Sequence, residues 1–285
     1  MVATLPLVAA FAVGLGTRRW LQRHFRLIFR VQFAVGLGVL AVLAGWSFDV
    51  TPKNAGAIGV LLVAQLTAVA VAAHVFRARR DGPLLAFAMY GNPGFWALPV
   101  ATATLGARAA VFLVAYDMLT QPRVAVALRL LRTRAPLPQS ARTAVTDYAP
   151  AAGAVLGLLL GHIAPAPEAL ATVVAALGIA MAVLGALLLG VAWPSRWAGR
   201  AEVGLCVRAL ALHVTVVPAV LLAATAAGMQ LPAAVWFLAL GPLPTSLVSF
   251  AKLYGYSSRV AATALALSVA WAAALLPVAA ILAGS

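Results

Sequence analysis

The amino-acid sequence predicts an all-α integral membrane protein of about ten transmembrane helices in two inverted five-helix repeats, with crossing, broken fourth and ninth helices. Three observations lead to this prediction. The composition is 64% hydrophobic and only 9% charged, the basic residues alternate between connections, and two apolar runs are interrupted at matched places. A soluble protein carries about 25% charged residues, so we expect a bilayer in place of water around this chain.

Ten apolar runs follow one another along the chain, and most are about as long as a helix needs to cross a bilayer. Helices are expected because unpaired backbone groups are costly in lipid. The runs in the first half are 2–17, 28–46, 55–76, 83–104 and 107–128, and those in the second half are 144–163, 167–191, 205–227, 231–251 and 258–282. We therefore predict a first repeat over 1–129, a cytoplasmic connecting loop over 130–143 and a second repeat over 144–285. Because each half has an odd number of helices, the halves would be inserted in opposite orientations.

The net charge of +14 comes from arginines and lysines in short segments between the apolar runs. Of the 20 basic residues, 18 fall on odd-numbered connections, and only Lys53 and Arg108 fall on even-numbered ones. Cytoplasmic loops of membrane proteins are enriched in basic residues. The odd connections are therefore predicted to be cytoplasmic. The protein would lie in the cell inner (plasma) membrane with both termini on the outer side. The partners expected from this pattern are lipids, and nucleic acid is not expected.

The fourth and ninth runs are each interrupted by proline and glycine. The two interruptions share a register, since Pro93 precedes Arg108 by 15 residues and Pro244 precedes Arg259 by 15 residues. Proline removes a backbone donor and clashes with the preceding turn, and irregular backbone at membrane depth is tolerated where it lines a cavity or packs inside protein. The residues predicted to form a binding site at these breaks are Asn92, Pro93, Gly94, Pro99, Pro242, Pro244, Thr245 and Ser246.

Matched breaks in two repeats are typical of the binding site of a secondary transporter. If the broken helices cross, the N-termini of their half-helices converge, and the partial positive charge there favours an anionic ligand. The alternative is that the prolines merely kink two packed helices.

At these residues the sequence resembles the auxin efflux carrier family of permeases, within the group that shares the bile acid sodium symporter fold. The family's fourth-helix pattern, Asn-x-Gly-Phe-x-x-x-Pro followed by a glycine, is matched by Asn92, Gly94, Phe95, Pro99 and Gly106. Its ninth-helix pattern is matched by Pro244, Thr245, Ser246, Ala251, Tyr254 and Gly255. Pro93, between Asn92 and Gly94, departs from the family pattern, and the central connection is shorter than that of the plant long-loop carriers.

The resemblance implies ten helices with outside termini and a crossover of the fourth and ninth helices. It also implies a scaffold of the first, second, sixth and seventh helices, against which the remainder moves in an elevator-like, alternating-access mechanism. The expected function is secondary transport of a small organic anion or weak acid, and homodimers are known in the family. A sodium-coupled bile acid-type symporter with the same fold and a non-transporting membrane scaffold are the alternatives.

Asp117 is the only carboxylate well inside an apolar run, and such groups usually face a cavity or a partner. We expect it to take part in proton or sodium coupling or in substrate contact, with Gln121 as a neighbour; the alternative is a hydrogen-bonded structural group. No other cofactor is expected. His74, His162 and His213 lie on separate runs without metal-ligand spacing, so no metal site is predicted. An enzyme is not expected because the chain lacks paired carboxylates or an activated nucleophile in the membrane.

Two further patterns concern helix packing. Gly153, Gly157 and Gly161 give one smooth face to the sixth run, which would allow close helix approach inside the protomer or across a dimer. Gln65 and Thr67 on the third run would either line a pathway or make interhelical hydrogen bonds.

Overall fold

The computed structural model describes residues 5–93, 97–130, 141–194 and 196–283, and within these ranges the side chains of some helical residues are left out. The described residues form helices and connections without a strand, so the all-α prediction is confirmed. Each of the ten predicted runs contains helix. The first run contains α1 (Leu5–Gly16), and the second contains α3 (Phe25–Val31), the π-helical η2 (Gln32–Gly36) and α4 (Leu37–Ser47). The third run is α5 (Pro52–Val75), the fourth contains α6 (Gly82–Phe87), the 3₁₀ turn η3 (Ala88–Tyr90) and α7 (Leu98–Leu105), and the fifth is α8 (Ala107–Leu130). The short helix α2 (Arg18–Leu21) lies in the predicted first connection.

The second half of the chain contains α9 (Ala141–Ile163), α10 (Leu170–Ala192), α11 (Arg200–Ala226), α12 (Ala234–Ala239), α13 (Ser246–Tyr254) and α14 (Ser258–Ala283). Residues 131–140, which make up most of the predicted connecting loop, lie outside the described residues. Helix starts follow local chemistry where the side chains are described. At the start of α5, for example, the Thr51 hydroxyl accepts a hydrogen bond from the Asn54 amide at 3.2 Å and Pro52 takes the first helical position, as expected for a capped N-terminus.

Four of the described helices are long and apolar enough to cross a membrane: Pro52–Val75, Leu170–Ala192, Arg200–Ala226 and Ser258–Leu275. Large apolar side chains also point outward from several helices. Val63 on α5, Leu159 on α9 and Leu222 on α11 are 57%, 57% and 59% exposed. Soluble monomers rarely leave wide apolar surfaces uncovered, so these helices are those of a membrane protein. Ten crossings in two inverted repeats remain a prediction.

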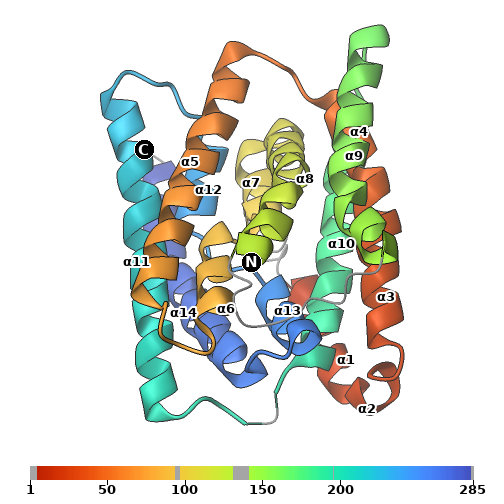
Figure 1. Cartoon of the computed structure of the whole chain (residues 1–285). Helices are drawn as coiled ribbons and strands as arrows, with labels where there is room; N and C mark the ends of the chain where they lie inside the picture. Colours follow the sequence, from red (N-terminus) through yellow and green to blue (C-terminus); the bar gives the residue numbers. More distant parts are fainter. Residues whose placement is uncertain (1–4, 94–96, 131–140, 195, 284–285) are drawn as a thin grey trace.

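The helices fall into two groups that stand side by side (Figure 1). The glycine-packed group contains α1, α4, α9 and α10, in which α4 packs along α9 and α1 packs along α10. The crossing group contains α5, α6, α7, α11, α12, α13 and α14, and α8 contacts elements of both groups. The larger apolar core lies in the crossing group, where Leu61, Leu85, Leu221 and Leu238 are fully or almost fully buried.

Glycine determines how closely the helices of the first group approach one another. A Cβ atom added to Gly153 would lie 2.6 Å from the Gly38 carbonyl oxygen, and one added to Gly161 would lie 3.0 Å from the Trp46 carbonyl oxygen. Both distances are shorter than an ordinary contact, so the α9 face of Gly153, Gly157 and Gly161 packs directly on the backbone of α4. Packing against α4 inside the protomer is therefore one role of this face.

Candidate functional site

The first interruption lies between η3 and α7. Gly91 ends η3 with φ +70° and ψ −175°, a combination that favours glycine because a Cβ would clash with the backbone. Asn92 follows and is 4% exposed, and Pro93 is buried beside it. The chain then re-enters helix, with the Ala97 amide donating to the Asn92 carbonyl oxygen at 3.2 Å. Proline and glycine in succession therefore break the fourth run at its middle, as predicted.

The second interruption lies between α12, which ends at Ala239, and α13, which begins at Ser246. Five successive residues of this stretch are buried: Gly241, Pro242, Leu243, Pro244 and Thr245. Two of them are prolines without an amide hydrogen, so a continuous helical ladder cannot form. The ninth run is therefore also broken at its middle.

The two broken runs pack against one another at their interruptions, and we call this place the crossing. α12 contacts α7, and α13 contacts α6, so the first half of each run lies against the second half of the other. The closest approach is at Gly91, where an added Cβ would lie 3.2 Å from the Leu238 carbonyl oxygen of α12. α7 and α13 each begin after the interruption of their own run.

Side chains from neighbouring helices pair the backbone that the first break leaves free. The Gln65 amide on α5 donates from Nε2 to the Tyr90 carbonyl oxygen at 2.8 Å, inside the protein. The Tyr116 hydroxyl on α8 donates in turn to Gln65 Oε1. Buried backbone groups without a partner cost about 1–3 kcal/mol each, so this chain of bonds stabilises the break. Gln65 therefore makes the interhelical bonds that were one of its two predicted roles, whereas Thr67 is exposed and bonds to the Val63 carbonyl oxygen of its own helix.

The second break is paired in the same manner. His213 on α11 is fully buried, and its Nε2 lies 3.2 Å from the Gly241 carbonyl oxygen. The Ser268 hydroxyl on α14 accepts a hydrogen bond from the Leu243 amide at 3.0 Å and donates to the Leu265 carbonyl oxygen at 2.7 Å. One carbonyl and one amide of the interrupted stretch thus find side-chain partners.

The partners of the two breaks occupy matching places in the sequence. Tyr90 and Gly241, whose carbonyl oxygens accept the side-chain bonds, each stand three residues before the prolines Pro93 and Pro244. The donors Gln65 and His213 come from the third run of their respective halves.

The same register relates α8 and α14. Asp117 stands 24 residues after Pro93, and Ser268 stands 24 residues after Pro244. Ser268 bonds to the second break, and Asp117 is half-buried on α8. The predicted coupling residue therefore takes the place in the first half that a backbone-pairing serine takes in the second.

Six of the eight predicted site residues lie in or directly beside the two interrupted stretches. Asn92, Pro93, Pro242, Pro244 and Thr245 are buried there, and Ser246 is half-buried as the first residue of α13. Gly94 lies outside the described residues, and Pro99 on α7 and Gln121 on α8 have no described side chain.

The sequence interpretation did not assign Tyr116, His213 and Ser268 to the site. Their places relative to the second break could have pointed to His213 and Ser268. Ser268 stands 24 residues after Pro244, as Asp117 does after Pro93, and His213 lies on the third run of its half, as Gln65 does. His213 was considered only as a metal ligand, and among the described residues no group of three or more histidine, cysteine, aspartate or glutamate side chains could hold a metal ion.

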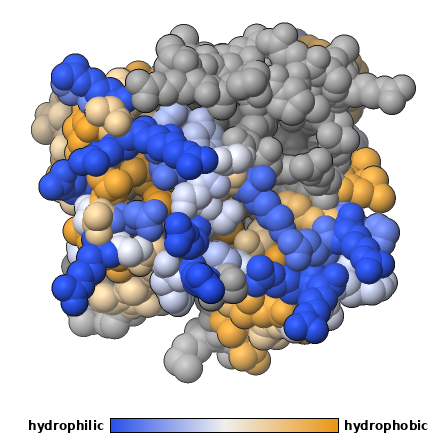
Figure 2. Space-filling model, turned by 60° about the horizontal axis from the view of Figure 1, so that its bottom comes forward, coloured by the Kyte–Doolittle hydropathy of each residue, from blue (hydrophilic) through white to orange (hydrophobic). Residues whose placement is uncertain are grey.

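Basic residues collect at one end of the molecule, the lower end in Figure 1, which Figure 2 turns toward the viewer. This end carries α2 and the connections α5–α6, α10–α11 and α13–α14. Its exposed basic side chains are Arg19, Arg23, Arg77, Arg79, Arg80, Arg196, Arg200 and Arg259. We call this end the basic face. The connections on it are odd-numbered ones, so four separate segments of the sequence contribute charge of one sign to the same face.

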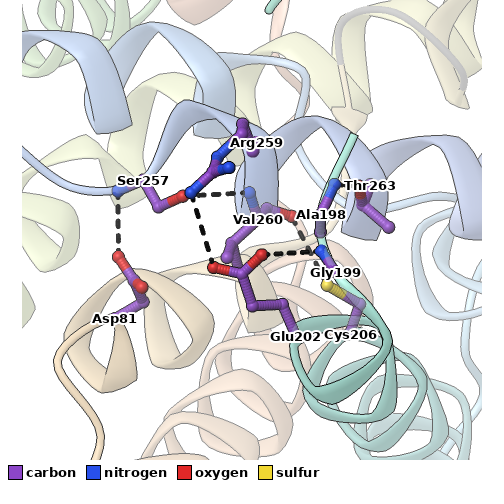
Figure 3. A network of polar contacts seen from close by, with 9 residues as sticks. All are labelled: Asp81, Ala198, Gly199, Glu202, Cys206, Ser257, Arg259, Val260 and Thr263. Carbon is purple, nitrogen blue, oxygen red and sulfur yellow. Dashed lines mark hydrogen bonds and ion pairs between the residues drawn. The ribbon is translucent and has the colours of Figure 1, made fainter. Parts of the chain in front are cut away.

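A polar network at the basic face ties three connections together (Figure 3). Asp81 Oδ1 accepts a hydrogen bond from the Ser257 amide at 2.9 Å. Glu202 Oε2 accepts one from the Gly199 amide at 2.8 Å, and its Oε1 lies 4.0 Å from Arg259 Nη2. These contacts join the α5–α6 connection, the start of α11 and the start of α14 within the crossing group.

The network continues on its inner side. The Thr263 hydroxyl accepts a hydrogen bond from the Ala198 amide at 3.3 Å, and the Cys206 thiol donates to the Val260 carbonyl oxygen at 3.5 Å. In the connection just before α14, burial raises the pKa of the Tyr256 hydroxyl, and the nearby Asp81 carboxylate adds to that shift. The basic-face ends of these helices are therefore held as one unit.

No protein-family model matches this chain, and no curated protein matches it either.

Proposed function

We propose that this protein is a secondary membrane transporter that moves a small organic anion or weak acid by an elevator-like, alternating-access mechanism, with its binding site at the crossing. The observation that carries the proposal is the meeting of two interrupted helices inside the protein, where buried irregular backbone is paired by side chains. Irregular backbone at membrane depth is costly unless it serves a cavity or packs inside protein. Two such breaks at matched positions are the pattern seen in transporters built from inverted repeats.

The helix pairings support two inverted five-helix repeats. If α1 corresponds to α9, and the run that ends in α4 corresponds to α10, the pairing of α1 with α10 is the counterpart of the pairing of α9 with α4. Both pairings occur, and both depend on glycine, since Gly14 packs on the Leu187 carbonyl oxygen and Gly153 on the Gly38 carbonyl oxygen. These four helices are the first, second, sixth and seventh runs, which would form the scaffold. The crossing group would be the moving part, in the cell inner membrane, with the basic face cytoplasmic and both termini outside.

The proposed ligand is anionic because the surroundings of the crossing offer positive potential and donors. Helix N-termini carry partial positive charge, and those of α7 and α13 begin at the crossing. Asn92 and Thr245 are buried polar side chains in the two breaks, with 4% and 9% exposure. Asp117, half-buried on α8, would be a coupling group for a proton or sodium ion, with Gln121 as its neighbour.

The experiment is uptake by the purified protein in proteoliposomes, with a panel of radiolabelled small organic acids. Asn92→Ala and Pro244→Ala should each reduce uptake at least about tenfold, as expected when a group that holds the bound ligand or its backbone frame is lost. Thr67→Ala is the matched control, because Thr67 is a polar residue of α5 that is exposed and bonds only to its own helix in the described structure.

Wild-type uptake rates in both variants at the crossing would contradict the proposal, provided that each variant is shown to be folded by its elution profile and thermal unfolding. Replacing sodium by choline in the same assay separates the two coupling ions. Loss of uptake without sodium would favour a sodium-coupled symporter of the bile acid type, whereas unchanged uptake would favour proton coupling. A folded wild-type protein that neither binds nor transports any acid of the panel would favour a membrane scaffold.

A further inference from the structure

One histidine nitrogen at the crossing has no hydrogen-bond partner. Among the described residues, Nδ1 of His213 is the one buried side-chain nitrogen or oxygen atom that lacks such a partner. The His213 ring lies between the two breaks, since its Nε2 is 3.2 Å from the Gly241 carbonyl oxygen and a Cβ added to Gly91 would be 3.7 Å from its Cε1. Buried polar atoms are normally paired, so this nitrogen requires an explanation.

The bond to Gly241 determines the protonation of the ring. A carbonyl oxygen only accepts hydrogen bonds, so Nε2 must carry the hydrogen and donate it. In the neutral imidazole, Nδ1 then keeps a lone pair and is an acceptor. His213 therefore presents a proton-accepting atom without a hydrogen-bond partner inside the crossing group, and the Met89 backbone is a second polar neighbour of the ring besides Gly241.

A hydrogen bond to the break does not by itself require histidine. Gln65 makes the equivalent bond to the Tyr90 carbonyl oxygen of the first break through an amide that does not titrate. What histidine adds to this bond is the second nitrogen, which has a lone pair that can bind a proton.

We infer that Nδ1 of His213 is the proton-binding atom of an anion site at the crossing, an inference that rests on the proposed transport function. A proton from water binds the Nδ1 lone pair, and the ring becomes an imidazolium that donates from both nitrogens. Nδ1–H then donates to a carboxylate or sulfonate oxygen of the ligand. The proton and the anion together bring no net charge into the buried site, which avoids the large cost of a lone buried ion. Each therefore favours the binding of the other.

The elements that pack against α11 bring no bonded carboxylate to Nδ1. α6 and α12 carry no titratable side chain, η3 carries Tyr90, and Tyr116 of α8 donates to Gln65. The remaining titratable or charged groups on these elements lie on the end turns of α5 and α14 or toward the basic face on α11: Lys53, His74, Arg200, Glu202, Cys206, Arg208 and Arg259. Asp117 lies on α8 and does not bond to Nδ1. The negative charge that pairs with a charged His213 therefore comes from the ligand.

The test uses His213→Gln, which keeps an amide donor for the Gly241 carbonyl oxygen and removes the titrating nitrogen. The matched control is His74→Gln, since His74 is an exposed histidine at the end of α5. The probes are pyruvate and benzenesulfonate, which stay ionised between about pH 5.5 and 7.5, so that any titration in this range belongs to the protein. Each variant is measured in proteoliposomes at several pH values, with internal and external pH equal.

Wild-type apparent affinity should rise as pH falls, by up to about tenfold per pH unit if one proton is bound with each anion. In His213→Gln this pH dependence should fall below about twofold, while His74→Gln should keep the wild-type profile. An unchanged pH profile in His213→Gln would overturn the assignment of the proton to His213.

A second measurement does not depend on transport. ¹⁵N NMR of the full-length protein in lipid nanodiscs, labelled on its four histidines, reports the protonation state of His213, assigned by comparison with His213→Gln. Without an anion the ring should be the neutral Nε2–H form, and excess benzenesulfonate at mildly acidic pH should convert it to imidazolium. A ring that stays neutral with both probes would overturn the inference. If the probes protonate His213 but are not taken up, the proton–anion site stands and the transport proposal fails. If the probes are taken up while His213 stays neutral, the transport proposal stands and the proton–anion site fails.

Discussion

Replacing Gly91 with alanine should destabilise the protein in two separable ways. The first is backbone strain, because Gly91 has φ +70° and ψ −175°, a region that is essentially restricted to glycine and costs another residue about 1–3 kcal/mol. The second is crowding, because the new methyl group would lie 3.2 Å from the Leu238 carbonyl oxygen of the other broken run. Overpacking of this kind adds about 1–3 kcal/mol, so the total loss should be about 2–6 kcal/mol.

Gly106 offers a matched control for the strain alone. It has φ +83° and ψ −177°, nearly the backbone conformation of Gly91, but no atom lies within 4 Å of an added Cβ. Gly106→Ala should therefore lose only the strain of about 1–3 kcal/mol. The free energy of unfolding of both variants can be measured by denaturant titration in detergent micelles. Equal losses in the two variants would show that the broken runs do not approach closely at Gly91, and would refute the geometry on which the site depends.

Two further substitutions test the packing and the pairing of the described helices. Gly157→Ala should cost about 1–3 kcal/mol by overpacking, because the added methyl group meets the Val42 carbonyl oxygen of α4. Its control is Gly204→Ala on an exposed face of α11, where no atom lies within 4 Å of an added Cβ, so this variant should be neutral or stabilised by up to about 1 kcal/mol. Thermal unfolding in detergent ranks the stabilities of the two variants. Ser268→Ala should cost about 1–3 kcal/mol because it leaves the buried Leu243 amide without its acceptor, and faster hydrogen exchange at that amide would report the lost bond; unchanged stability and exchange would mean that another group pairs this amide.

Much of the fold follows from patterns that a single sequence displays. Apolar runs and their lengths predicted helices at the places where the structure has them, because a chain surrounded by lipid must pair its own backbone. Proline and glycine predicted both interruptions to within a few residues. Pro93, Pro242 and Pro244 each lack an amide hydrogen, and this loss breaks the helix at the position of the proline itself. The glycine face of Gly153 and Gly157 predicted a close helix contact, but not which helix would fill it.

The partners of the two breaks were harder to predict because they depend on contacts between distant segments. Gln65 and Tyr90 are 25 residues apart, and His213 and Gly241 are 28 apart, so no local pattern connects them. A buried histidine among apolar residues looks in sequence like any other packed side chain. Its neighbours become known only when helices from separate runs are placed side by side.

If the crossing group moves as proposed, the basic face would limit how far it travels along the membrane normal. The exposed arginines of the crossing group on the basic face are Arg77, Arg79 and Arg80 on the α5–α6 connection and Arg200 and Arg259 at the starts of α11 and α14. A charged arginine drawn to the centre of a bilayer costs at least about 3 kcal/mol, so five of them moving together would oppose a deep descent. Long side chains can still reach the headgroups after a small displacement. The reach of these arginines therefore sets an upper bound on the stroke toward the opposite side.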